Sequence, residues 1–175
     1  VEAVHNNPFI PIAWQKEHKG MQGSAYITKE VFIKEANANW LQARDYAVKQ
    51  AKYLNQTCQV TKQLCNRLLE PFMWTTMLIT GSREGWQNFF NLRCPDYFGV
   101  KSRKEASKEF FEKGNIDTSK WSDLDWLHLN KGQDEIHIME LSEKIYDAVN
   151  ESTPKQLQAG EWHIPFRKKI DNDIL

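Results

Sequence analysis

Two arginines, Arg67 and Arg93, are the residues of this sequence best suited to bind an anion. A guanidinium group stays charged at every physiological pH, and its planar fork of N–H groups fits a phosphate or a polarised carbonyl. Arg67 lies in the polar stripe of a predicted helix, whose members recur at spacings of three and four. These members are Gln63, Asn66, Arg67 and Glu70. The stripe predicts that one face of this helix is polar.

Arg93 lies on the aromatic face of a second predicted helix, which extends from Arg83 to Arg93. The other members of this face are Trp86, Phe89 and Phe90. A single arginine in such a place is equally well explained by a snorkelling side chain or a cation–π contact. Two arginines joined by an apolar segment make an anionic ligand the better explanation. Because an unpaired buried charge is costly, Arg93 needs a partner, which is Glu70, Glu135 or the ligand itself.

The element between the two arginines is predicted to be a buried strand. Residues 72–80 are mostly apolar and rich in β-forming residues, a pattern typical of a strand that is covered on both faces. A long amphipathic helix is predicted over residues 29–54, and further helices over 106–113 and 133–149. Asp134 and Glu135 are expected in the first turn of the last helix. These elements predict an α/β domain with residues 72–80 in its interior.

The composition is that of an ordinary globular domain and excludes some functions. The 175 residues include 23 Lys+Arg and 23 Asp+Glu, and the pI is near 7.1. This balance argues against a general nucleic-acid or membrane-surface binder, which carries a basic excess. No apolar run approaches transmembrane length. The three cysteines match no zinc spacing, so we expect reduced, buried thiols, no metal and a cytoplasmic location.

The sequence contains none of the common catalytic motifs. There is no Walker loop, GxGxxG, HExxH or GxSxG motif and no internal repeat. No serine or cysteine is marked as a nucleophile by its neighbours. A reaction that is carried out by a bound cofactor, without a covalent protein nucleophile, therefore suits this sequence best.

Several short motifs occur in an order that resembles the flavin-dependent thymidylate synthases. They read NRLLEP at 66–71, NFFNLR at 88–93 and GQDEI at 132–136. A KGMQ segment at 19–22 and a GEWHIP segment at 160–165 are most similar to a divergent, phage-associated branch of that family. The ordered combination is more specific than any single motif. The family's flavin-binding motif would precede Val1, so we expect the chain to be the C-terminal part of a longer protein.

The resemblance implies an activity and a set of site residues. The expected reaction is the reductive methylation of deoxyuridine monophosphate (dUMP) to dTMP, with FAD as cofactor and NADPH and methylenetetrahydrofolate as co-substrates. Arg93 would polarise the uracil carbonyl as the catalytic residue. Substrate binding is expected at Gln22, Arg67 and Arg93, and cofactor binding at Arg83, Asn88 and Gln133. The implied fold is α+β, with helices packed on a small mixed or antiparallel sheet.

The resemblance also implies an assembly and leaves two alternative functions open. Family members are homotetramers with sites shared between subunits, and the expected location is the cytoplasm of a bacterium or of a phage-infected host. Residues 96–130 separate two motifs that usually lie close together, so we expect a peripheral insertion in a single domain, outside the nucleotide site. The alternatives are a one-carbon modification of another deoxypyrimidine nucleotide and a non-catalytic nucleotide-binding or structural subunit.

Overall fold

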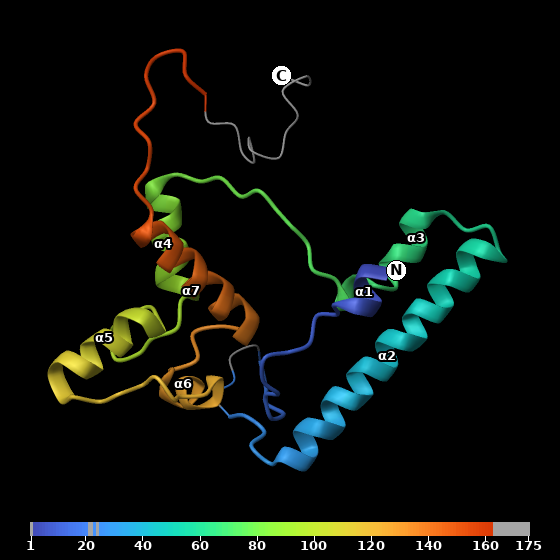
Figure 1. The fold of residues 1–175 in the computed structure, drawn as a ribbon, viewed down its shortest axis with the longest axis horizontal. Coiled ribbons are helices and arrows are strands. Elements are labelled where there is room, and N and C mark those ends of the chain that lie inside the picture. Colours follow the sequence, from blue (N-terminus) through green and yellow to red (C-terminus); the bar gives the residue numbers. More distant parts are fainter. Residues whose placement is uncertain (1, 21–22, 24, 163–175) are drawn as a thin grey trace.

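The structure is a computed structural model that describes residues 2–20, 23 and 25–162, and it is mostly helical (Figure 1). Its elements are α1 (Glu2–Asn6), α2 (Glu30–Gln56), α3 (Lys62–Arg67), the short 3-10 helix η1 (Glu70–Phe72), α4 (Arg83–Arg93), α5 (Arg103–Gly114), α6 (Asp123–Leu129) and α7 (Ile136–Glu151). The helices form two halves. The first half holds α1 to η1, and the second half holds α4 to α7 (Figure 1).

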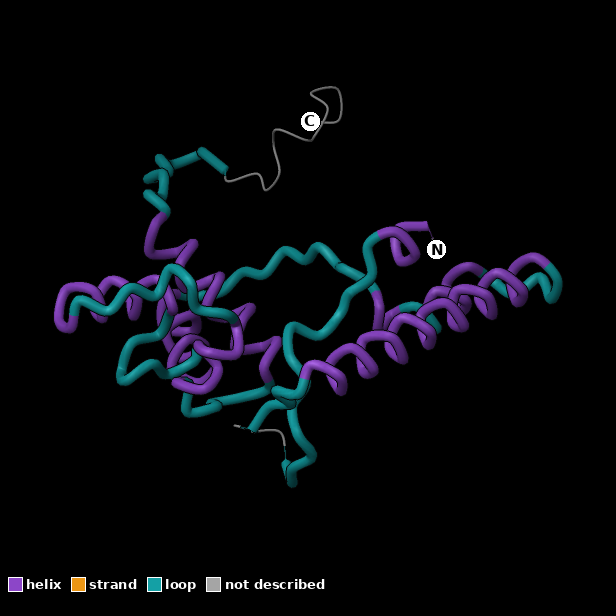
Figure 2. The backbone as a smooth tube through the Cα atoms, turned by 60° about the horizontal axis from the view of Figure 1, so that its bottom comes forward, coloured by secondary structure: helices purple, strands orange, loops and turns teal. Residues whose placement is uncertain are grey.

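The predicted α/β fold is wrong, because the described residues form no sheet (Figure 2). They contain only two isolated bridges, between Gln15 and Tyr26 and between Tyr97 and Val100. Residues 73–82 run as an irregular connection between the two halves, and Met77 and Leu78 are 67% and 60% exposed. A strand needs a neighbour that accepts and donates its backbone hydrogen bonds. This segment has none among the described residues, so its β-forming composition does not produce a strand.

The first half is organised by α2, which confirms the long helix predicted over residues 29–54. α1, α3 and η1 pack against the C-terminal part of α2 around one buried cluster. Its members are Val4, Val48, Ala51, Cys65, Leu69 and Phe72. Arg44 of α2 is also buried, and its Nη1 donates to the carbonyl oxygens of Val4 and His5 at 3.3 and 2.7 Å. These bonds satisfy carbonyls at the end of α1, which a five-residue helix leaves without internal partners.

The second half contains the aromatic helix α4, which begins and ends where the sequence predicted. Ser82 caps α4, because its side chain accepts a hydrogen bond from the backbone N–H of Gly85 at 3.1 Å. α4 ends at Arg93, since Pro95 disfavours helical geometry at Cys94. α7 begins three residues later than predicted. Glu135 is its N-cap residue and accepts from the backbone N–H groups of His137 and Ile138, so Asp134 and Glu135 precede the first turn.

Residues 96–130 form α5, α6 and the connections around them, and they carry their own apolar cluster. The buried members of this cluster are Tyr97, Ala106 and Trp126. Leu127 of α6 belongs to a second cluster, with Tyr26, Ile136 and Met139, which joins the segment to α7. The segment is therefore packed on the second half. Its role as an insertion stays a prediction, but its expected position outside the nucleotide site conflicts with the pocket described below, because Asp96, Gly99, Val100 and Lys101 line that pocket.

Aromatic contacts join the two halves near residues 7–14. The ring of Phe9 lies 5.3 Å from the ring of Trp74 and 5.0 Å from that of His137 at the start of α7. Trp14 contacts Trp40 of α2, with the ring centroids 5.9 Å apart. Such pairs add to the stability gained by burying apolar area. The two halves are thus linked by a few aromatic side chains and two extended segments (Figure 2).

Candidate functional site

The strongest candidate site lies where the end of α4 meets the segment that leads into α7. Arg93 is the last residue of α4, and its Nη1 pairs with the carboxylate of Asp134. The side chain of Asp134 is 7% exposed and that of Arg93 is 44% exposed. The backbone is fixed from the other side, because the Ser142 hydroxyl of α7 donates to the carbonyl oxygen of Arg93 at 2.7 Å. Asp134, which lies 41 positions further along the chain, therefore holds the guanidinium, and Ser142 holds the backbone of the same residue.

A small polar pocket of about 190 Å³ is lined by residues next to Arg93 and Asp134 in the sequence, although these two residues do not line it themselves. Its lining residues are Asn91, Cys94, Pro95, Asp96, Gly99, Val100, Lys101 and Gln133. Amide, carboxylate and ammonium groups all face this space, whereas apolar side chains are few. The pocket is smaller than the 300–1,000 Å³ typical of small-molecule sites. It can receive the polar edge of a flat ring, but not a large cofactor.

A tight turn at residues 96–100 shapes one wall of the pocket. Asp96 accepts from the backbone N–H of Gly99 at 2.6 Å and pairs with Lys131 at 2.9 Å. The hydrogen bond from Lys131, together with the one from Gly99, lowers the pKa of Asp96. Phe98 and Gly99 have φ angles of 58° and 95°, a left-handed geometry that glycine adopts without strain. The ionised carboxylate thus holds the turn closed.

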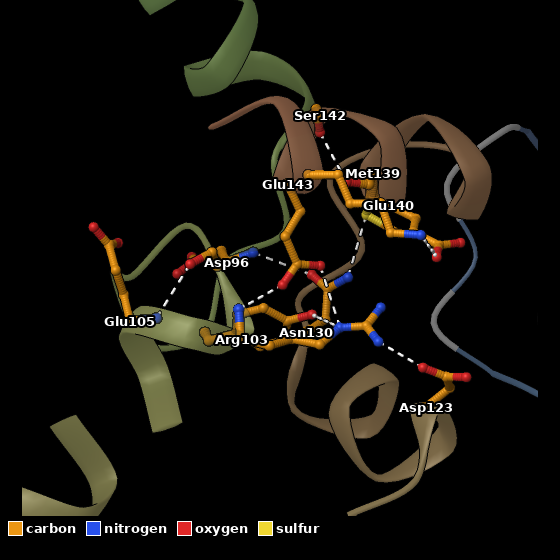
Figure 3. A network of polar contacts seen from close by, with 12 residues as sticks. Asp96, Arg103, Glu105, Asp123, Asn130, Met139, Glu140, Ser142 and Glu143 are labelled. Atoms are coloured by element: carbon orange, nitrogen blue, oxygen red, sulfur yellow. Dashed lines mark hydrogen bonds and ion pairs between the residues drawn. The ribbon is translucent and has the colours of Figure 1, made fainter. Parts of the chain in front are cut away.

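A buried amide and a buried ion pair belong to a polar network that includes Asp96 of this turn (Figure 3). Asn130 Oδ1 accepts from the backbone N–H groups of Asp96 and Gly132 at 3.2 and 2.9 Å, so it fixes the two loops relative to each other. Glu143 of α7 accepts from the backbone N–H of Arg103 at 2.5 Å and pairs with its Nε at 3.2 Å. Burial raises the pKa of Glu143, and Arg103 opposes that shift.

The pocket offers no activated nucleophile. Cys94 is 2% exposed, and burial raises the pKa of its thiol. A thiol with a raised pKa is protonated at neutral pH and reacts poorly. Of the thiols expected to be buried, Cys65 and Cys94 are buried and Cys58 is exposed. In the part of the chain that the structure describes, no cluster of three or more metal-ligating side chains is present.

The structure brings together only some of the residues that the sequence singled out. Gln133 lines the pocket next to the Arg93–Asp134 pair, whereas Arg83 and Asn88 are exposed along α4. Arg67 lies on α3 in the other half, where its Nη1 pairs with Glu70 at 3.1 Å (Figure 1). Arg67 and Arg93 therefore do not share one site within a chain. Gln22 lies outside the described residues.

Sequence reasoning missed several residues of the site. Asp134, rather than Glu70 or Glu135, is the acidic partner of Arg93. Its position beside Gln133 in the GQDEI motif was a signal, but the helix was expected to begin before it. Asn130 and Lys101 stand in irregular segments with no periodic pattern, so nothing in their neighbourhood marked them.

Comparison with known proteins adds no relative. No protein-family model matches the chain, and no match was found among curated proteins or solved structures. Across the residues that the structure describes, no helix combines the length and apolar character that a membrane crossing requires. A function for this chain therefore rests on its own residues and their geometry.

Proposed function

We propose that this chain is part of a flavin-dependent thymidylate synthase-like protein and that it binds the pyrimidine ring of a deoxyuridine nucleotide beside Arg93. The observation that carries the proposal is the meeting of Arg93 with the segment that contains Gln133, next to a polar pocket. The NFFNLR motif, which resembles the family, ends at Arg93, and the GQDEI motif begins one residue before Gln133. Arg93 donates through Nη1 to Asp134, and the described residues show no second partner for its remaining N–H groups. Those groups are available to a uracil carbonyl.

The proposed role of Arg93 is electrostatic. A guanidinium held by Asp134 and by the backbone contact to Ser142 is oriented before the ligand arrives, so little reorganisation is needed on binding. Donation to a uracil carbonyl would draw electron density from the ring and stabilise charge that develops there during carbon–carbon bond formation. The proposal places no covalent bond between protein and substrate, which agrees with the protonated Cys94 thiol.

The described residues of one chain do not form a flavin site. A pocket of about 190 Å³ is too small for a dinucleotide cofactor, and neither Arg83 nor Asn88 lines it. A flavin would supply the hydride in the proposed reaction, but it would need further residues from outside this chain. The described residues also lack the sheet that the resemblance implies, so the proposal rests on the site and its motifs.

We expect the replacement of Arg93 by Lys to weaken dUMP binding by about ten- to a hundredfold. The lysine keeps the charge and can still pair with Asp134, but it loses the planar fork, and a charge-assisted hydrogen bond contributes roughly 1.5–3 kcal/mol. Titration calorimetry of the wild type, Arg93→Lys and Lys113→Gln measures this effect. Lys113 is exposed on α5, so its removal is the control. The melting temperature should change little, because Arg93 is 44% exposed.

Two outcomes of that titration separate the alternatives. Tighter binding of deoxycytidine monophosphate than of dUMP would favour modification of another deoxypyrimidine nucleotide. Unchanged dUMP affinity with a large loss of melting temperature would show that Arg93 is a structural ion-pair residue. Of the two alternatives, the ion pair between Arg93 and Asp134 favours a non-catalytic nucleotide-binding or structural subunit over a change of substrate.

We further propose that the chain forms a homo-oligomer, with a tetramer expected from the resemblance. Apolar side chains are exposed along the 27 residues of α2 and along residues 73–82. Examples are Phe32, Tyr46, Tyr53, Trp74, Met77 and Leu78. Surfaces of this kind mark interaction sites. Light scattering at micromolar concentration should give a mass above that of one chain, whereas a monomeric mass would contradict the proposal.

A further inference from the structure

The charges of this protein are unevenly distributed along the chain. Residues 46–69 contain four cationic side chains and no Asp or Glu, although the two kinds balance at 23 each in the whole sequence. The four are Lys49, Lys52, Lys62 and Arg67. These residues form the last part of α2, the turn after it and α3, at one end of the first half (Figure 1). Arg67 is paired with Glu70, so the three lysines carry the excess positive charge that attracts anions to this end.

A pocket of about 420 Å³ lies at this end, between α2 and α3. Its lining residues are Ala51, Lys52, Asn55, Gln56, Lys62, Cys65 and Asn66. Ala51 and Cys65 belong to the buried cluster and are 1% and 4% exposed, so they form an apolar floor. The remaining lining groups are ammonium and amide groups. Five of the seven lining residues are polar or charged, so the pocket is more polar than most small-molecule sites, and its volume falls in their usual range.

The two lysines of this pocket have no acidic partner among the described residues. Three lysines elsewhere on the helices, Lys34, Lys113 and Lys144, are each paired with a glutamate four positions away at 2.6 Å. No ion pair within the described part of the chain involves Lys52 or Lys62. Asn55 is already engaged, because its Nδ2 donates to the carbonyl oxygen of Val60 at 2.9 Å and thereby holds the turn between the helices. The hydrogen bond of Asn55 thus fixes one wall of the pocket, and the charges of Lys52 and Lys62 have no acidic partner there.

We propose that this pocket binds a phosphorylated small molecule, with Lys52 and Lys62 on the phosphate group. Lysine is a common phosphate ligand, since its ammonium group is a compact charge with three donors. The amides of Gln56 and Asn66 add donors, and the Ala51–Cys65 floor accepts the organic part of the ligand. The site goes beyond the proposed pyrimidine site, which lies in the other half, and Arg67 is not among its lining residues.

Calorimetric titration with pyrophosphate and with adenosine 5′-monophosphate tests the site. The solution should contain about 0.15 M salt, where the Debye length is about 8 Å and distant charges contribute little. We expect Lys52→Gln and Lys62→Gln each to weaken the binding of both probes by about tenfold. Lys49→Gln is the matched control, because it removes the same charge from an exposed position of α2 outside the pocket. It should change the affinity by less than about twofold.

The comparison of variants decides between a site and a diffuse charge effect. Equal losses for Lys49→Gln, Lys52→Gln and Lys62→Gln would overturn the proposal, and so would the absence of binding to folded wild-type protein. Tighter binding of adenosine 5′-monophosphate than of pyrophosphate would support the role of the apolar floor. The variant Arg93→Lys should retain full affinity for pyrophosphate, so failure of the pyrimidine site and failure of this pocket are distinguishable.

Discussion

Replacement of Glu143 by Ala is expected to lower the free energy of unfolding by about 3–5 kcal/mol, the cost of leaving a buried charge without its partner. Glu143 is 6% exposed at its side chain and accepts from both the backbone N–H and the Nε of Arg103. Arg103 also pairs with Asp123 of α6 at 2.5 Å and donates from Nε to the Tyr97 hydroxyl at 3.3 Å. One carboxylate of α7 therefore holds the start of α5 and, through Arg103, the start of α6 (Figure 3).

Glu151 provides the control for this prediction. It lies on the same helix and pairs with Lys104 of α5, but its side chain is 54% exposed. Exposed ion pairs contribute at most about 1 kcal/mol, so Glu151→Ala should cost far less. Urea denaturation followed by circular dichroism gives both values. If Glu143→Ala cost no more than Glu151→Ala, the Arg103–Glu143 contact would not be a buried ion pair.

A double variant separates the ion pair from the space that it fills. Arg103→Met together with Glu143→Leu replaces both charges with apolar groups of similar size, an exchange that is often neutral or stabilising. We expect the double variant to recover part of the loss seen in Glu143→Ala. Full recovery is not expected, because the backbone N–H of Arg103 loses its acceptor. A double variant less stable than Glu143→Ala would contradict this account.

Replacement of Leu69 by Ala is expected to cost about 2–5 kcal/mol of unfolding free energy, as for other fully buried leucines. Leu69 is 1% exposed and lies in the cluster that joins α1, α2 and η1. The surrounding backbone is helical on both sides, so it cannot collapse fully into the space that the side chain leaves. Urea denaturation measures the loss, and amide hydrogen exchange should locate it in the first half.

Leu64 is the matched control, since it is also a leucine of this segment but is 63% exposed. Leu64→Ala should change the unfolding free energy by less than about 0.5 kcal/mol. Equal losses for the two variants would mean that α3 buries a different face from the one in the structure.

The sequence determined most of the helices, because their signals are local. The period of apolar residues in 29–54 predicts α2, and the aromatic face of 83–93 predicts α4, since an α-helix makes its hydrogen bonds within its own segment. The start of α7 was misplaced by three residues because Glu135, with a helix-favouring side chain, serves as a cap. The motifs marked Arg93 and Gln133 as site residues, but they did not predict that Asp134 is the acidic partner of Arg93.

The tertiary structure alone decided the fate of residues 72–80 and the partner of Arg93. A strand exists only if another segment lies beside it, and no local property of this apolar run supplies that neighbour. The Arg93–Asp134 contact joins residues 41 positions apart, and the buried Arg103–Glu143 pair joins residues 40 positions apart. Contacts of this kind depend on how α4, α5 and α7 pack, because burial and distance, rather than residue type, determine which charges compensate one another.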